Sequence, residues 1–87
     1  MYISKWVFKN DEEFHETTIS LKKNLTPFII IRVIPRRFIK DYHIVVRDYN
    51  TGILLNEKEL KKSNYSIYKA KIIVKKLAFN IIKKNLN

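Results

Sequence analysis

The order of hydrophobic and polar residues predicts an antiparallel sheet followed by one long helix. Residues 15–23 alternate between the two classes, which is typical of a strand with one buried face. Residues 28–34 are apolar on both faces except at Arg32, and this pattern favours a strand in the middle of a sheet. A polar turn at residues 24–27 separates the two segments, so both belong to the predicted sheet.

Shorter stretches supply the other predicted strands. Residues 2–8 are rich in aromatic and β-branched side chains, which favours a short strand. Residues 42–48 alternate again, and residues 53–55 form their hairpin partner. The hairpin loop contains Gly52, the only glycine, which can adopt a positive φ. Residues 56–62 are predicted to form a polar connection with room for one helical turn.

Residues 65–84 carry the pattern of an amphipathic helix, with polar residues at 63–66 to cap its first turn. The stripe that would face the sheet consists of Ile67, Ala70, Val74, Leu77 and Ile81, widened by Ile73 and Ala78. A second apolar strip, Tyr68, Ile72 and Phe79, lies roughly 120° to 180° around the helix. One sheet face buries only the first stripe. The second strip therefore needs the N-terminal strand, a second copy of the chain or another protein to cover it.

These elements predict an α+β fold, in which three to four antiparallel strands carry one long C-terminal helix packed on one face. The chain has 87 residues, so we expect a single small domain over residues 1–87. Hydrophobic residues make up 46% and aromatic residues 13%, more than a disordered chain contains, which indicates a packed core. Cysteine is absent, which excludes disulfide bonds, thiolate zinc sites and cysteine nucleophiles.

Positive charge is concentrated in the last third of the chain. The net charge is +10, and residues 60–87 contain eight lysines and no acidic residue. The chain is rich in Lys, Ile and Asn, the residues of AT-rich codons, but this bias does not explain why Asp and Glu stop at Glu59. We therefore expect the C-terminal region to attract polyanions, nucleic acid first among them. The alternative is a solvated helix face.

Two groups of cations are candidate contacts to nucleic acid. Lys69, Lys76 and Lys83 recur every seven residues on the polar face of the predicted helix, where they can follow a phosphate backbone. All four arginines fall within residues 32–47, and a guanidinium can make bidentate hydrogen bonds to phosphate or guanine. An ordinary polar loop is the alternative interpretation of the arginines. The predicted nucleic-acid-binding residues are Arg32, Arg36, Arg37, Lys40, Arg47, Lys61, Lys62, Lys69, Lys76 and Lys83.

The chain contains no recognisable pattern of catalytic or metal-binding residues. His15, Glu16 and His43 are the only set with acid-base or metal-binding chemistry, and their spacing does not require them to meet. The acids at 11–13 have the character of a solvated turn. We therefore expect no enzymatic activity, no catalytic residue, no metal and no cofactor.

The segment Tyr42–Gly52, followed by a helix that contains Lys69-Ala70, resembles the hairpin and helix of the arm-binding domain of tyrosine recombinases. That family lays a three-stranded sheet in the major groove of DNA, so the resemblance implies binding to duplex DNA. The chain departs from that pattern at residues 53–55, which offer no basic side chain to DNA. For this reason no site residue is carried over from the family.

The preferred function is non-catalytic binding of nucleic acid, with duplex DNA favoured. The alternative is a small inhibitor or adaptor of the kind used by phages and other mobile elements, which would dock on an acidic host protein through Tyr68, Ile72 and Phe79. A homodimer joined by the same residues is compatible with either function. No segment approaches the roughly 18 apolar residues of a membrane span, so we expect no membrane partner and a location in the cytoplasm, such as that of a phage-infected bacterium.

Overall fold

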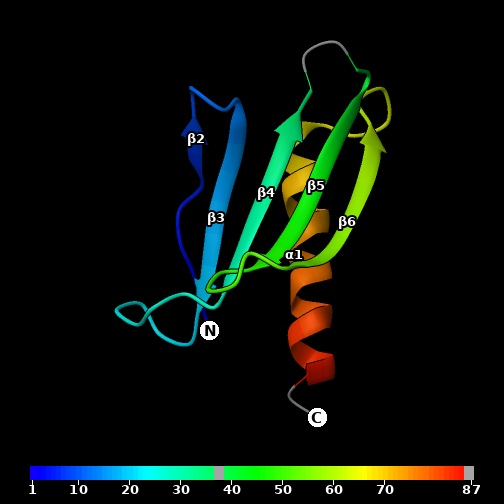
Figure 1. Ribbon diagram of the computed structural model, residues 1–87. Coiled ribbons are helices and arrows are strands. Elements are labelled where there is room, and N and C mark those ends of the chain that lie inside the picture. Colours follow the sequence, from blue (N-terminus) through cyan, green and yellow to red (C-terminus); the bar gives the residue numbers. More distant parts are fainter. Residues whose placement is uncertain (37–38, 86–87) are drawn as a thin grey trace.

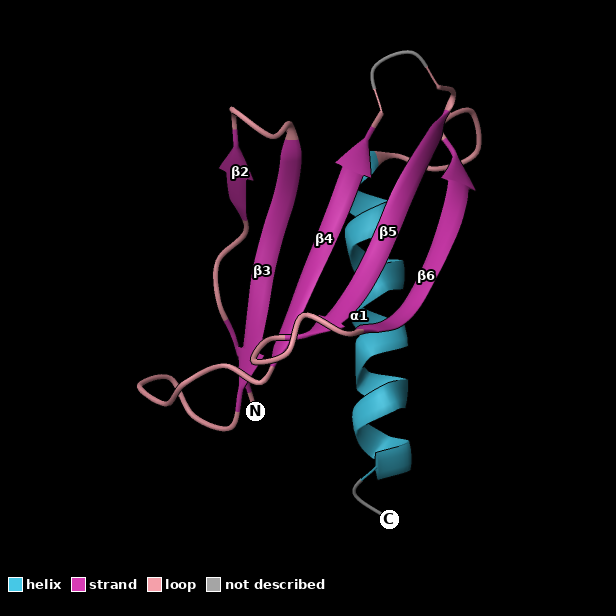
Figure 2. Cartoon of the chain, viewed as in Figure 1, coloured by secondary structure: helices cyan, strands magenta, loops and turns pink. Residues whose placement is uncertain are grey.

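The computed structural model describes residues 1–36 and 39–85, in which a six-stranded antiparallel sheet carries one C-terminal helix (Figures 1 and 2). The elements are β1 (Tyr2–Ile3), β2 (Val7–Lys9), β3 (Phe14–Ser20), β4 (Ile29–Pro35), β5 (Asp41–Asp48), β6 (Leu54–Lys61) and α1 (Ile67–Asn85). The strand order is β1-β3-β4-β5-β6, and β2 also pairs with β3. The predicted α+β fold is confirmed, but three to four strands was too low a count.

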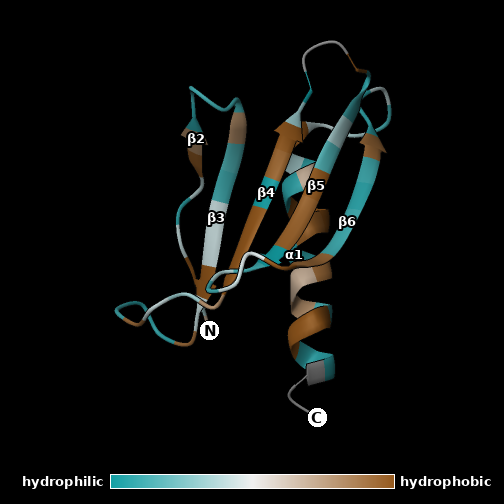
Figure 3. Cartoon of the chain, in the orientation of Figure 1, coloured by the Kyte–Doolittle hydropathy of each residue, from teal (hydrophilic) through white to brown (hydrophobic). Residues whose placement is uncertain are grey.

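The middle of the sheet is β4, as its continuous apolar run predicts. Ile31 lies opposite Thr17 of β3 and Val46 of β5, and all three side chains are almost fully buried on the face that α1 covers. Figure 3 shows that β4 is hydrophobic over most of its length, whereas β6 at the sheet edge is mostly hydrophilic. The core therefore lies between α1 and the central strands.

The helix packs on one face of the sheet, against β4, β5 and β6. Ala70, Val74 and Ala78 are fully buried there, and the two alanines let the helix backbone approach the sheet closely. The Ser66 hydroxyl accepts a hydrogen bond from the Lys69 amide at 3.2 Å, which caps the first turn as the sequence predicts. The predicted helix of 65–84 thus forms with its start displaced by two residues.

The N-terminal region forms two short strands instead of one strand over residues 2–8. The Ser4 hydroxyl accepts a hydrogen bond from the Thr18 amide at 3.0 Å and contacts the Thr17 hydroxyl at 2.9 Å. A side-chain oxygen therefore occupies a place that a backbone carbonyl holds in a regular ladder. This substitution interrupts the strand between β1 and β2.

The largest error in the predicted elements concerns β6. Residues 56–62 were predicted to form a polar connection, but the strand continues to Lys61 and pairs along the whole of β5, from Asp41↔Lys61 to Arg47↔Leu54. Only Leu60 of this strand is buried. Because β6 is an exposed edge strand, the hydrophobic alternation that marks other strands is missing, and its formation depends on pairing with β5.

Two loop predictions have different outcomes. Gly52 adopts φ 75° in the β5–β6 hairpin, where its amide donates to the Asp48 carbonyl at 2.9 Å, so the predicted turn is confirmed. The strand predicted over residues 15–23 ends at Ser20, because the Ser20 hydroxyl donates to the Lys22 carbonyl at 2.7 Å and begins a turn. Leu21, which the alternation of residues 15–23 places on the same face as Ile19, is consequently exposed.

Candidate nucleic-acid interface

The surface of α1 that points away from the sheet, here called the outward face, carries uncompensated positive charge. Lys69, Lys76 and Lys83 are exposed, and the helix contains no acidic residue between Ile67 and Asn85. Successive members of this series are seven residues apart, which corresponds to about 10 Å along the helix axis. The three ammonium groups can therefore follow an extended polyanion.

The second apolar strip shares this outward face with the lysines. Tyr68 is 75% exposed, Ile72 53% and Phe79 39%, so neither β1 nor β2 covers the strip. Residues three or four apart on a helix are surface neighbours, which places Lys76 beside Ile72 and Phe79. The outward face is thus a mixed surface of ammonium groups and large apolar side chains.

Lys71 and Lys75 lie on the flank of α1 and contact Trp6. Their Nζ atoms are 5.2 Å and 5.8 Å from the centroid of the Trp6 ring, within the range of cation–π attraction. The Trp6 ring in turn packs against the core. These two lysines are consequently held in place, unlike those of the outward face.

The described arginines lie on the opposite face of the sheet, and these are Arg32, Arg36 and Arg47. Side chains alternate along a strand, so Arg32, between buried Ile31 and Val33, points away from α1. Its Nε donates to Oε2 of Glu16 at 3.1 Å, and its guanidinium stacks over the Phe14 ring at 4.7 Å. The Arg32 charge is therefore paired within the molecule.

Arg36 is held by a chain of polar side chains on that same face. It donates from Nη2 to Nδ1 of His43 at 3.0 Å and lies 3.4 Å from Oε1 of Glu59. A guanidinium has no acceptor, so Nδ1 of His43 accepts and Nε2 donates to Glu57 at 3.0 Å. Arg47 donates to the Gly52 carbonyl at 2.9 Å, and Arg37 lies outside the described residues.

The lysines predicted outside the helix gather at the end of the sheet where α1 begins (Figure 1). The Lys62 amide donates to the Lys40 carbonyl at 2.8 Å, and the Lys61 carbonyl accepts from the Tyr65 amide at 3.1 Å. Lys62 is engaged, since its Nζ donates to the Arg36 carbonyl at 2.6 Å. Lys40 and Lys61 are exposed at this end, where Lys61 lies opposite Asp41 of β5.

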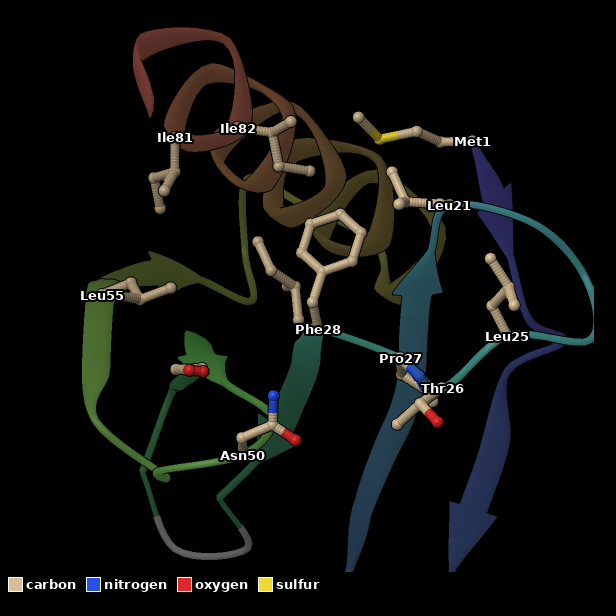
Figure 4. A pocket seen from close by; sticks show the side chains of 12 residues that line it. Met1, Leu21, Leu25, Thr26, Pro27, Phe28, Asn50, Leu55, Ile81 and Ile82 are labelled. Atoms are coloured by element: carbon tan, nitrogen blue, oxygen red, sulfur yellow. The ribbon is translucent and has the colours of Figure 1, made fainter. Parts of the chain in front are cut away.

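At the other end of the molecule, an apolar hollow of about 620 Å³ opens between the last turns of α1 and the sheet (Figure 4). Figure 4 shows Ile81 and Ile82 of α1 above Phe28, with Leu21 on one side and Leu55 on the other. No pattern in the sequence predicts this hollow, because its walls come from segments far apart in the chain. Leu25, an apolar residue within the polar turn before β4, is the signal that could have indicated it.

The two histidines do not form a shared site. His15 lies opposite Val33 on the face that α1 covers, whereas His43 lies opposite Ile34 on the other face. Within residues 1–36 and 39–85, no group of three or more His, Cys, Asp or Glu side chains is arranged to hold a metal ion. In the same part of the chain, no helix is both long and apolar enough to cross a membrane.

Comparisons of the chain with protein-family models, curated proteins and solved structures find no match. The resemblance to the arm-binding domain of tyrosine recombinases therefore gains no support from them. The geometry and charge of this chain carry the functional interpretation.

Proposed function

We propose that the chain is a non-catalytic nucleic-acid-binding protein that places the outward face of α1 along a phosphate backbone, with duplex DNA as the favoured ligand. The observation that carries the proposal is the series of exposed lysines on a helix without a single acidic residue. All eight acidic residues precede Leu60 and lie outside α1. The proposed site of action is the cytoplasm, for example that of a phage-infected bacterium.

The paired carboxylates and the exposed lysines of α1 lie on different faces of the molecule, which supports placing the nucleic acid along α1. The carboxylates of Glu16, Glu57 and Glu59 lie on the sheet face that points away from α1. Each of them contacts an arginine or histidine side chain there. On that face these carboxylates compensate the neighbouring cations, so a polyanion is attracted to the helix instead. Because the side chains of the three described arginines also lie on the far face, the proposed interface excludes these three, in contrast to the prediction from sequence.

The proposed contact surface combines the outward face with the adjoining end of the sheet. Its exposed cations are Lys40, Lys61, Lys69, Lys76 and Lys83. Lysine contacts to phosphate position a protein on nucleic acid without reading sequence, so weak sequence preference is expected. Five phosphate contacts correspond to a slope of about −4.5 in log K against log salt, or roughly a 500-fold loss of affinity between 50 and 200 mM salt.

Fluorescence anisotropy with a labelled duplex and a labelled single strand tests the proposal at both salt concentrations. The variant K69Q/K76Q/K83Q should lower the slope by about 2.7. A matched control, K9Q/K22Q/K23Q, removes the same number of exposed charges from β2 and the β3–β4 loop and should retain the slope of the wild type. Absence of binding at 50 mM salt, or equal losses in both variants, would contradict the proposal.

The exposed apolar strip favours a second candidate, an inhibitor or adaptor that docks on an acidic host protein, or a homodimer. Tyr68, Ile72 and Phe79 are large side chains exposed on one helix face, which is unusual for a surface without a partner. The variant I72S/F79S separates these functions. A shift from dimer to monomer in analytical ultracentrifugation indicates self-association, whereas an unchanged monomer that loses a protein ligand indicates an adaptor.

A further inference from the structure

Two lysines on the flank of α1 lie over the Trp6 ring, on the same side of the sheet as His15 of β3. Lys71 and Lys75 are four residues apart, so they lie on the same side of the helix, and their Nζ atoms both lie over the Trp6 ring. His15 projects from β3 toward the face that α1 covers, opposite Val33 of the core. The His15 ring contacts the Phe8 ring with a centroid distance of 4.8 Å, which holds it beside β2.

These cations act on one another electrostatically. Burial, and then the charge of Lys71, lower the pKa of His15 below its ordinary value. Burial, and then the charge of Lys75, lower the pKa of Lys71. The protonated forms are disfavoured because the like charges repel and part of their hydration is lost. An anion placed between the three groups would relieve this repulsion.

The carboxylates in the ion pairs of the described residues lie on the other sheet face, away from this cluster. Glu16, the neighbour of His15, points to the opposite face and is paired with Arg32. Across residues 1–36 and 39–85, none of the ion pairs joins a carboxylate to Lys71, Lys75 or His15. On the other sheet face Arg32 and Arg36 are paired with carboxylates, whereas the ion pairs of the described residues supply no carboxylate to this cluster.

We propose that Lys71, Lys75 and His15 form a phosphate-binding site on the flank of α1, beside Trp6. Two ammonium groups supply charge and several donors, and an imidazole N–H supplies a directed hydrogen bond to a tetrahedral oxyanion. The cation–π contacts restrain the lysine side chains before the ligand arrives, which reduces the conformational entropy lost on binding.

The phosphate can come from a nucleic-acid backbone or from a free phosphate ion. The first source rests on the proposed function: Lys75 is four residues from Phe79, so the site adjoins the outward face along which the backbone would run. The site then extends that contact surface sideways. It would anchor one backbone phosphate more firmly than the exposed lysines of the outward face.

Trp6 is the only tryptophan of the chain, and it reports on this site directly. Trp6 emission and the NMR titration of the His15 ring are followed while inorganic phosphate, a duplex or sodium chloride of equal ionic strength is added. We expect a saturable change in Trp6 emission and a rise in the pKa of His15 with phosphate and duplex, and no saturable change with chloride. The variant K71Q/K75Q should lose both responses.

The control variant K69Q/K76Q removes two lysines of the outward face and should retain the response to inorganic phosphate. H15Q, which leaves both lysines in place, should weaken that response severalfold, and circular dichroism verifies that each variant is folded. Duplex binding by anisotropy without a response of Trp6 or His15 overturns the site and leaves the proposed function standing. A response to phosphate without duplex binding retains the site and overturns the function. Absence of both overturns both.

Discussion

The outward face of α1 and the sheet face that points away from α1 both carry many charges, but only the sheet neutralises them internally. On the sheet, the Arg32 guanidinium is paired with Glu16 and stacked on an aromatic ring. On the helix, the exposed side chain of Lys76 has no acidic residue on the same element to pair with. A count of basic residues therefore does not identify a binding surface, whereas the position of their counter-charges does.

The energetic consequence is that the two faces differ in what a polyanion must displace. A phosphate that approaches Arg32 competes with an existing ion pair whose carboxylate side chain is only 17% exposed. A phosphate that approaches Lys76 displaces water and releases counterions from the nucleic acid, which is favourable at low salt. The outward face of α1 should thus contribute to the affinity for nucleic acid. The sheet face that points away from α1 should contribute to the stability of the fold.

The most direct comparison removes two charges from each face. K69Q/K76Q should lower duplex affinity roughly 100-fold at 50 mM salt, about tenfold for each lost phosphate contact. R32Q/R47Q removes the same charge from the sheet and should change that affinity by less than about threefold, a residual effect of net charge. Anisotropy titrations at constant salt measure both.

The variant with the larger loss of duplex affinity should have the smaller loss of stability. K69Q/K76Q removes only exposed side chains and should leave the urea midpoint unchanged within error. R32Q/R47Q breaks the contacts to Glu16 and to the hairpin carbonyl, so its midpoint should fall. Equal losses of affinity in the two variants would show that the faces do not differ as described.

The second largest effect concerns the Arg32–Glu16 pair alone. R32Q should cost about 1 kcal/mol of unfolding free energy, because Glu16 then keeps a carboxylate in a mostly buried position without its partner. E16Q/R32Q together should recover part of that loss. Urea unfolding of the wild type, both single variants and the double variant measures the coupling. A coupling near zero would mean that the pair is a passive surface contact.

Hydrophobic periodicity predicted the parts of the fold that are buried. The alternation around Ile44 and Val46, the apolar run of β4 and the inward stripe of α1 all mark faces that lose contact with water, and these elements are present in the structure. The same reasoning predicted the exposed strip that contains Ile72, because one sheet face can cover only one side of a helix. Burial thus explains where the predictions held.

Features that depend on pairing between distant segments could not be predicted from the sequence pattern. β6 has only Leu60 buried, so no periodic signal marked it, and its strand exists because β5 offers a partner along its length. The ion pair between Arg36 and Glu59 requires the register that brings Glu59 opposite His43. The candidate arginines were therefore predicted from their chemistry, but their neutralisation became visible only in three dimensions.

A smaller effect is expected at Arg36. Its ion pair with Glu59 joins side chains that are 35% and 49% exposed, so solvent screening limits its contribution to stability to about 0.5 kcal/mol or less. R36Q should also leave duplex affinity within about twofold, since the residue lies on the far face. Urea unfolding and anisotropy measure the two quantities. A fall in affinity of tenfold or more would return Arg36 to the interface.

The smallest effect is a dependence of stability on pH that arises on the helix side alone. Burial and the charge of Lys71 lower the pKa of His15 in the folded state, so the unfolded chain binds a proton there more readily. The contribution of His15 to stability is therefore fully present above its ordinary pKa of about 6.5 and declines as the pH falls through the lowered folded value.

Urea unfolding between pH 7.5 and pH 5 would detect this decline as a fall in the unfolding midpoint. H15Q should flatten this part of the profile, and K71Q should reduce it, because Lys71 is the charge that acts on His15. The matched variant K76Q lies on the outward face of the same helix and should leave the profile unchanged. If K76Q and K71Q flatten the profile equally, the effect comes from the net charge of the molecule, and His15 is not part of a local cluster of cations.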